Sequence, residues 1–213
     1  MNRWVIFGAA EIRDYAAIRN KIKEDDVIVC ADGGYRHLEP LGLCADLILG
    51  DFDSAPRPET DAEVLTFPVE KDDTDMLLAV KEGLRRGCRS FLMFGGTGGR
   101  FDHTYANLQT LLYAEKHGAS AALADAENFM FLLKNDTAYI EKNEGENVSV
   151  FAFDPVCSGV TLTGFYYPLR NGTLYAHMPL GASNRITAPQ GKITVKKGTL
   201  LIVISKEGNA HEG

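Results

Sequence analysis

Short apolar runs that end at a glycine or an aspartate constrain the fold of this chain more than any other feature. The clearest are WVIF at 4–7, VIVCA at 27–31, LIL at 47–49 and SFLMF at 90–94. Each has the length of a buried strand and is followed by a residue that permits a tight turn. Segments with helical spacing lie between them. This half of the chain is therefore predicted to have an α/β fold, with an open, mostly parallel sheet flanked by helices.

Two of the intervening segments have apolar residues at helical spacing, over 14–23 and 74–86. Cations close the second segment and Gly87 follows them, as at many helix C-termini. A third helix is predicted after residue 101, running through Leu112. Further short strands are expected at 64–67, 120–123 and 127–133.

Acidic residues follow the predicted strands. Residues 46–54 read DLILGDFDS, with Asp51 and Asp53 two apart, so that in extended backbone both point to the same face. A second acidic cluster, EKDDTD at 70–75, stands just before a predicted helix. Asp32 ends another strand, where its alternative role is to cap a short helix over 35–41. Ligands of open α/β sheets bind at the carboxyl ends of the strands, where these acids are placed.

Such a cluster of carboxylates requires compensation. Two like charges about 4 Å apart repel by roughly 4 kcal/mol at an effective dielectric near 20. Either some carboxylates are protonated or a cation lies among them, and Mg²⁺ prefers oxygen ligands of this kind. Aspartate and glycine are also common in plain turns, which is the better interpretation of either cluster alone. The two clusters together favour a metal site.

A glycine-rich loop, GGTGGRFDHTYAN, follows the strand at 90–94. Bare backbone amides before a helix are typical of phosphate-binding loops, although glycines also mark ordinary turns. The spacing matches neither the dinucleotide-binding nor the P-loop motif. Arg100 could bind phosphate oxygens through its fork of donors, and Asp102 could cap the helix. His103 has no partner at metal-ligand spacing and is interpreted as structural.

The composition excludes several classes of function. The 213 residues carry a net charge of −7 without a basic stripe, so no nucleic-acid partner is expected. No run approaches the roughly 20 apolar residues of a membrane span, and the apolar stretch at the N-terminus is shorter than a signal peptide requires, so neither is expected. The four cysteines form no CxxC pair. We therefore expect a cytoplasmic protein with reduced thiols.

Helical periodicity stops near Asn135, and short strands with turn residues take over. They are expected at 148–153, 160–163, 174–177, 193–195 and 200–204, with hairpin turns at 171–172 and 197–198. The second half therefore reads as an antiparallel sandwich or barrel. We place the domains at 1–134 and 135–213.

Four segments occur in a set order: DGG at 32–34, GDFDS at 50–54, KDDTD at 71–75 and GGRFDH at 98–103. In this combination the sequence resembles the thiamine pyrophosphokinase (thiamine diphosphokinase) family. The resemblance covers the first half strongly, and it reaches the second half through GASN at 181–184, which is similar to the family's Ser-Asn element.

The resemblance implies an α/β catalytic domain that binds ATP and Mg²⁺, followed by a thiamine-binding β-sandwich, in a homodimer. The implied reaction moves the terminal diphosphate of ATP to the hydroxyethyl oxygen of thiamine and releases AMP. The implied partners are ATP, thiamine and a second copy of the chain near whose interface thiamine binds, with no nucleic acid and no membrane.

The resemblance also implies roles for individual residues. Asp51, Asp53 and Asp75 would bind Mg²⁺ or position the attacking hydroxyl, with Asp72 and Asp32 beside them in the catalytic centre. The residues implied to serve the nucleotide are Asp32, Gly95, Gly96, Thr97, Gly98, Gly99, Arg100 and Asp102.

Ser183, Asn184 and Lys71 are implied to serve thiamine. A cationic thiazolium ring favours an aromatic neighbour, for which Tyr166 and Tyr167 are the candidates. Two other functions stay open at this point. Water could replace the alcohol in a metal-dependent hydrolase of nucleotides or diphosphates, and a nucleotide or thiamine sensor would bind ligand without turnover.

Overall fold

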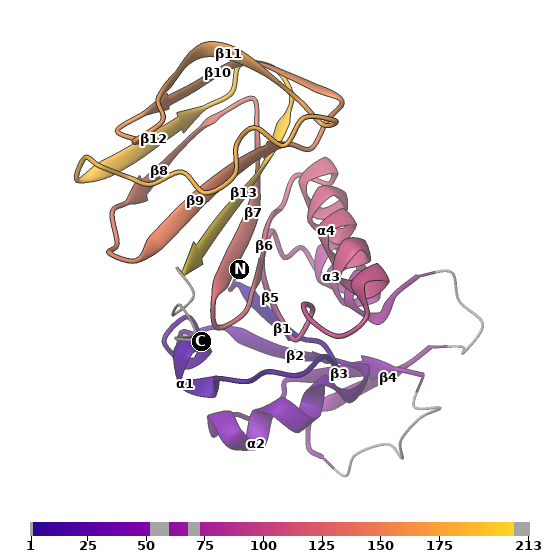
Figure 1. The fold of residues 1–213 in the computed structure, drawn as a ribbon. Coiled ribbons are helices and arrows are strands. Elements are labelled where there is room, and N and C mark those ends of the chain that lie inside the picture. The colour runs from indigo at the N-terminus through magenta and orange to yellow at the C-terminus, as the bar shows by residue number, and fades with distance from the viewer. Residues whose placement is uncertain (1, 52–59, 68–72, 207–213) are drawn as a thin grey trace. The chain divides into compact units, whose positions relative to one another are not determined.

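The apolar runs at 4–7, 27–31, 47–49 and 90–94 form parallel strands of one sheet in the computed structural model (Figure 1). The structure describes residues 2–51, 60–67 and 73–206. The chain divides into two units, Met1–Ala126 and Glu127–Gly213. Within the described ranges, no helix combines the length and the apolar character that a membrane span requires.

The first unit alternates strands and helices. Its strands are β1 (Trp4–Phe7), β2 (Val27–Ala31), β3 (Leu47–Gly50), β4 (Glu63–Thr66), β5 (Ser90–Phe94) and β6 (Ser120–Ala124). Its helices are α1 (Tyr15–Arg19), the 3₁₀ helix η1 (Asp32–His37), α2 (Leu38–Leu41), α3 (Asp75–Arg85) and α4 (Phe101–Lys116).

The strands of this unit stand in the order β4-β3-β2-β1-β5-β6, and each neighbouring pair is parallel. The chain moves from β1 outward to β4 and then returns to add β5 on the other side of β1. Figure 1 shows α1 and α2 on one side of the sheet and α3 and α4 on the other. The predicted α/β fold is confirmed, and its strand order reverses between β1 and β5.

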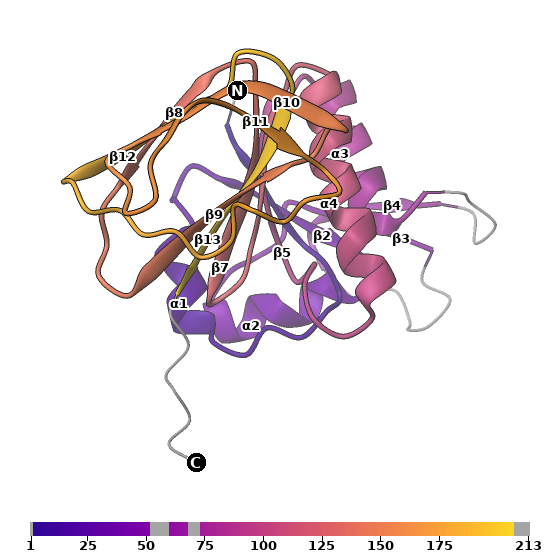
Figure 2. The same ribbon diagram turned by 45° about the horizontal axis from the view of Figure 1, so that its top comes forward.

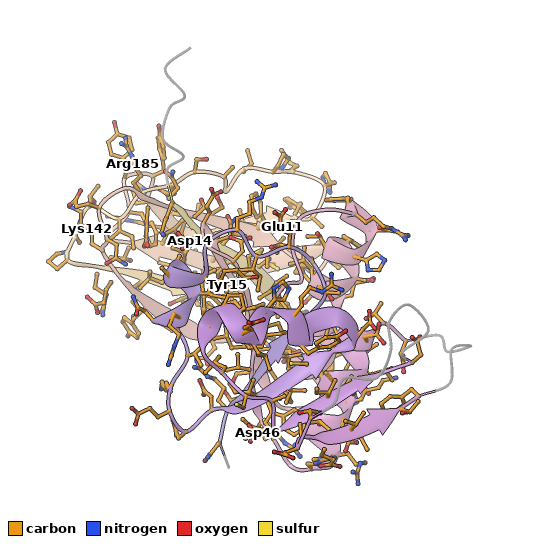
Figure 3. The ribbon with its side chains drawn as sticks, turned by 90° about the horizontal axis from the view of Figure 1, so that it is seen from below. Glu11, Asp14, Tyr15, Asp46, Lys142 and Arg185 are labelled. Carbon is orange, nitrogen blue, oxygen red and sulfur yellow. The ribbon has the colours of Figure 1, made fainter. Side chains whose placement is uncertain are left out.

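Helix α1 is shorter than the segment 14–23 that periodicity predicts. The Asp14 side chain caps it by accepting the backbone N–H three residues on, at 2.9 Å (Figure 3). The Arg3 guanidinium donates to the Lys21 carbonyl at 2.7 Å. After Arg19 the chain continues in tighter turns, in which the Lys21 N–H donates to the Ile18 carbonyl at 2.9 Å and the Ile22 N–H to the Arg19 carbonyl at 3.2 Å.

Asp46, which opens the predicted central stretch, serves the sheet. Its carboxylate accepts the backbone N–H of Ile28 at 2.7 Å (Figure 3). This bond joins the entry of β3 to β2, so the carboxyl ends of the two strands stay in register.

A buried carboxylate joins α3 to the sheet edge. Glu82 is 8% exposed and accepts hydrogen bonds from Arg85 at 2.7 Å and Arg86 at 2.6 Å. Arg86 also donates to Glu63 of β4 at 2.7 and 2.8 Å. The bidentate arginine therefore connects helix and edge strand with both of its carboxylate partners charged.

The second unit is an antiparallel sandwich (Figure 2). Its strands are β7 (Asn128–Lys134), β8 (Thr137–Glu141), β9 (Glu146–Ala152), β10 (Val156–Thr163), β11 (Leu169–Tyr175), β12 (Gln190–Thr194) and β13 (Thr199–Lys206). One sheet contains β7-β13-β9 and the other β11-β10-β12-β8. The buried core draws side chains from both sheets, among them Val150, Val160, Ile193 and Ile202. The predicted β-sandwich is confirmed.

Two details of the second half differ from the sequence expectations. Residues 171–172 lie inside β11, where Asn171 has a φ of +47° and the pairing with β10 shifts register, so the predicted hairpin there is wrong. The turn at 197–198 links β12 to β13, which belong to different sheets, so it is not a hairpin either.

The structural division also falls earlier than the predicted boundary at 134–135. Strand β7 pairs along its full length with β13, from Asn128 with Ser205 to Lys134 with Thr199. This long-range pairing assigns β7 to the second unit, whereas its apolar sequence reads equally well as a last strand of the first half.

Replacing Glu82 by Gln removes the carboxylate that both arginines bind. We expect the free energy of unfolding to fall by about 2 kcal/mol near neutral pH, as for other hydrogen bonds to charged groups. Hydrogen bonds from Arg85, opposed by burial and joined by those from Arg86, lower the pKa of Glu82 from 4.5 to about 2. The stabilisation is thus complete above pH 4.5 and is lost as the pH falls toward about 2.

Chemical denaturation of both proteins across this pH range measures the difference. Glu144→Gln is the matched control, because Glu144 is 88% exposed and pairs with Lys142. The control should change stability little. An equal loss in both variants would show that overall charge, and not the buried pair, causes the effect.

Candidate active site

A pocket of about 190 Å³ opens where the strand order of the first unit reverses. Its walls come from the ends of β1, β2 and β5, from the start of α3 and from the first two turns of α4. The lining residues are Gly8, Ala9, Ala10, Ala31, Asp32, Thr74, Asp75, Met76, Gly95, Gly96, Gly98, His103 and Asn107. Because the helices on either side of a reversal diverge, the strand ends there stay open to a ligand.

Backbone-to-backbone contact forms the floor of this pocket. The Gly8 N–H donates to the Phe94 carbonyl at 2.8 Å, and the Ala10 N–H to the Gly95 carbonyl at 3.0 Å. A Cβ on Gly95, which has a φ of +62°, would lie 2.3 Å from the Gly8 carbonyl oxygen. Any side chain at Gly95 would therefore push the ends of β1 and β5 apart.

The glycine-rich loop is held by two side chains. The buried Asn107 amide of α4 donates to the Gly96 carbonyl at 2.8 Å, and the Thr97 hydroxyl donates to Asp125 at 2.8 Å. Gly98 and Gly99 both have positive φ, which lets the loop turn into the first residue of α4. The loop thus ends at the N-terminus of a 16-residue helix, where backbone N–H groups favour an anion.

Arg100 and Asp102 pair with each other at 2.6 Å, and both are exposed. The predicted role of Asp102 as the cap of α4 is wrong: the cap position is Arg100, and Asp102 stands in the first turn and accepts the N–H of His103. The hydrogen bond from Arg100 lowers the pKa of Asp102. The Arg100 fork therefore stands at the loop with a partner that an incoming phosphate could replace.

Two of the predicted acids share the pocket. Asp32 follows β2 with a φ of +49°, and Asp75 is the first residue of α3. Asp32 starts η1 and caps no helix, since the position before η1 is Ala31. A Cβ on Gly50 would lie 3.1 Å from the Asp32 Cα, so the end of β3, and with it Asp51, comes alongside.

The remaining acids divide into two groups. Asp53, Asp72 and Lys71 lie outside the described residues. Asp73 lies within them and pairs with Lys81 at 2.5 Å. Across residues 2–51, 60–67 and 73–206, no three His, Cys, Asp or Glu side chains group as a metal site would require.

The N-terminus of α3 is capped by Thr74, whose hydroxyl accepts the Leu77 N–H at 3.3 Å. Thr74, and not one of the acids beside it, therefore fills this cap position. Sequence reasoning missed Asn107 as a pocket residue and interpreted His103 as structural. Both stand in the first two turns of the helix that follows a glycine-rich loop, and this position is the signal that could have placed them at the pocket.

In the second unit, the Asn184 side chain holds the backbone of Tyr167 in place. It is 5% exposed, its amide donates to the Tyr167 carbonyl at 2.8 Å, and its side-chain oxygen accepts the Tyr167 N–H at 3.0 Å. Ser183, with a φ of +54°, donates its N–H to the Ser149 hydroxyl at 3.0 Å. These bonds hold residues 166–167 in a defined place.

The segment that Asn184 holds carries two exposed tyrosines. Tyr166 and Tyr167 are 56% and 65% exposed, and their rings meet edge to face with centroids 4.8 Å apart. The Arg185 guanidinium lies 5.4 Å from the Tyr166 ring centre. An exposed aromatic pair held by a buried amide suits recognition of a flat or cationic ligand.

Two family models match this chain. One, described as the catalytic domain of thiamin pyrophosphokinase, matches residues 18–123, and the other, described as its vitamin B1 binding domain, matches residues 137–200. A thiamine pyrophosphokinase of Bacillus subtilis (strain 168) is 31% identical over 191 residues, covering 86% of this chain and 89% of the relative.

Solved structures of thiamin pyrophosphokinases have the same fold as this chain. The crystal structure of thiamine pyrophosphokinase from Bacillus subtilis superposes with a TM-score of 0.87 at 27% identity, covering 96% of this chain and 99% of that one. The enzyme from Geobacillus thermodenitrificans has a TM-score of 0.84 at 27% identity, with 98% and 99% covered. The chain belongs to the thiamin pyrophosphokinase family.

Proposed function

We propose that this chain is a thiamine diphosphokinase, which transfers the terminal diphosphate of ATP to the hydroxyethyl oxygen of thiamine and releases AMP. Family membership over both halves of the chain carries this assignment. The pocket of the first unit supports it, because an open strand-end site with a glycine-rich loop and two carboxylates suits a polyphosphate and its cation.

The triphosphate of ATP is assigned to the glycine-rich loop. Backbone N–H groups of residues 95–99 and the N-terminus of α4 would bind phosphate oxygens. Arg100 would exchange Asp102 for a phosphate, to which its planar fork of donors is matched. Asp32 follows β2 at the same edge of the sheet and lines the same pocket, where it would lie near a cation that accompanies the nucleotide.

Mg²⁺ fits the residues present. Asp32 and Asp75 line one pocket, and Mg²⁺ in such sites is usually held by one or two carboxylates plus substrate phosphates. Asp51, Asp53 and Asp75 are the residues proposed to hold it. When bound, the ion would neutralise phosphate charge that otherwise repels these carboxylates.

The chemistry is a substitution at phosphorus. The hydroxyethyl oxygen of thiamine attacks the β-phosphorus, the bond from that phosphorus to the oxygen it shares with the α-phosphorus breaks, and AMP leaves with that oxygen. The hydroxyl proton passes to a carboxylate of the catalytic set Asp51, Asp53, Asp72 and Asp75. Transfers of this type depend mostly on positioning and charge neutralisation, which a rigid strand-end pocket provides.

Thiamine is assigned to the Ser183–Asn184 segment of the second unit, with Lys71 as a further contact. Asn184 would act through Tyr167, since its amide oxygen and nitrogen both bind the Tyr167 backbone. The thiazolium cation would lie against the exposed tyrosines. We propose a homodimer with the thiamine site near its interface.

The reaction is tested by incubating the protein with ATP, Mg²⁺ and thiamine and separating the nucleotides. We expect AMP and thiamine diphosphate in equal amounts, both dependent on thiamine. ADP as the product, or AMP formed equally well without thiamine, would contradict the assignment, and the second result would indicate a hydrolase.

Replacing Asp51 or Asp75 by Asn removes a charge that holds the cation. Turnover should fall by ~10²-fold or more, as when other fixed charges that stabilise a transition state are lost, with unchanged circular dichroism. Asp25→Asn is the control, because Asp25 is exposed in the loop before β2. A variant that turns over like the control would remove its residue from the catalytic set.

Replacing Tyr167 by Ala removes one face of the proposed thiamine site. The KM for thiamine should rise by about tenfold, equivalent to about 1.4 kcal/mol, while the KM for ATP stays unchanged. Tyr139→Ala on β8 is the control, because Tyr139 is also exposed, at 61%. Equal thiamine KM values in the two variants would reject this location.

A further inference from the structure

Asp73 is separated from the other acids of KDDTD by an ion pair. Its carboxylate receives a hydrogen bond from the Lys81 ammonium of α3 at 2.5 Å. The two side chains are 28% and 36% exposed. The pocket is lined by Thr74 and Asp75 but not by Asp73. Asp73 therefore belongs to the acidic cluster in sequence and to the flank of α3 in space.

Helix geometry explains why Lys81 is the partner. Residues seven apart lie on the same face of a helix, so Lys81 stands two turns above Thr74, and helical side chains lean toward the N-terminus. The ammonium thus reaches back past the helix start to Asp73. It also lies 5.5 Å from the ring centre of Tyr113 on α4.

This arrangement attaches the entry of α3 at a second point besides its cap. Thr74 holds the first turn through the Leu77 N–H, and Leu78 donates to the Thr74 carbonyl at 2.9 Å. Asp73, one residue earlier, forms an ion pair with Lys81, which also contacts the Tyr113 ring of α4. Asp75, two residues after Asp73, is the first residue of the helix that this entry begins.

We propose that Asp73 is a positioning residue that, through Lys81 and Tyr113, holds Asp75 in place at the pocket, and that it is neither a metal ligand nor the catalytic base. The proposal rests on the proposed function for its kinetic consequences. The anchoring itself is a property of the protein without ligands.

The experiment uses Asp73→Asn, Lys81→Met, the double variant and the conservative Lys81→Arg. The readout is the Mg²⁺ concentration that gives half-maximal thiamine-dependent AMP formation. Because loss of either partner frees the helix entry, each single variant should raise this midpoint, by about three- to tenfold, since small misplacements of reacting groups are costly. The double variant should match the singles, since the pair acts as a unit, and Lys81→Arg should stay near the wild type.

Arg85→Met is the matched control. Arg85 stands one turn further along α3 and pairs with Glu82, away from the helix entry. It should leave the Mg²⁺ midpoint unchanged, even where its thermal midpoint falls as much as that of the test variants.

A second readout needs neither metal nor nucleotide. Amide hydrogen exchange of the first turn of α3, at Leu77 and Leu78, should be faster in Asp73→Asn and Lys81→Met than in the wild type or Arg85→Met. Unchanged exchange in both test variants would overturn the proposal.

The direction in which each variant shifts the Mg²⁺ midpoint distinguishes the positioning role from other roles of Asp73. If Asp73 acted only through its charge, Lys81→Met would lower the Mg²⁺ midpoint while Asp73→Asn raised it. If Asp73 were a ligand or the base, Asp73→Asn would lose nearly all turnover and Lys81→Met would keep it. Either result would overturn the positioning role. A wild type without thiamine-dependent AMP would reject the proposed function, and the exchange measurement would still decide the anchoring.

Discussion

The close approach of two backbones at the ends of β1 and β5 is the constraint on which the pocket depends. Gly8 and Gly95 donate and accept hydrogen bonds across this point, and neither could carry a Cβ without a clash against the other's carbonyl oxygen. Gly34 makes the same kind of approach, since a Cβ there would lie 1.9 Å from the Phe7 oxygen. Three strand ends thus converge with backbone alone, and the space above them is left for a ligand.

The acids near these strand ends have different surroundings and different partners. Asp32 and Asp75 face the pocket, Asp46 serves as a strand link, and Asp73 is neutralised on the flank of α3. Neighbouring carboxylates repel each other by several kcal/mol, so a pocket can hold only as many charged acids as nearby positive charge balances. The same logic keeps Glu82, buried in α3, between two arginines.

The second unit solves a different problem, which is to hold exposed aromatic rings on a surface. The sandwich core is rigid, and the buried Asn184 amide connects the exposed segment to it. Its side-chain oxygen and nitrogen both form hydrogen bonds with the Tyr167 backbone. A side chain this well satisfied shapes a site more than it contacts a ligand. The structure thus shows Asn184 fixing the backbone of Tyr167.

Local patterns in the sequence determined the α/β class, the sandwich, the glycine-rich loop and the strand-end position of Asp32, because alternation of apolar runs, helical spacing and glycine turns are properties of neighbouring residues. Tertiary structure alone decided which acids share the pocket. Asp73 and Asp75 are only two positions apart in the chain, but Asp73 pairs with Lys81 on the flank of α3 while Asp75 lines the pocket. It also decided that β7 joins the second unit, that Asn171 and Gly172 form an irregularity within β11, and that Asn184 faces inward. Each of these depends on a partner distant in the chain, with which no local spacing can pair it.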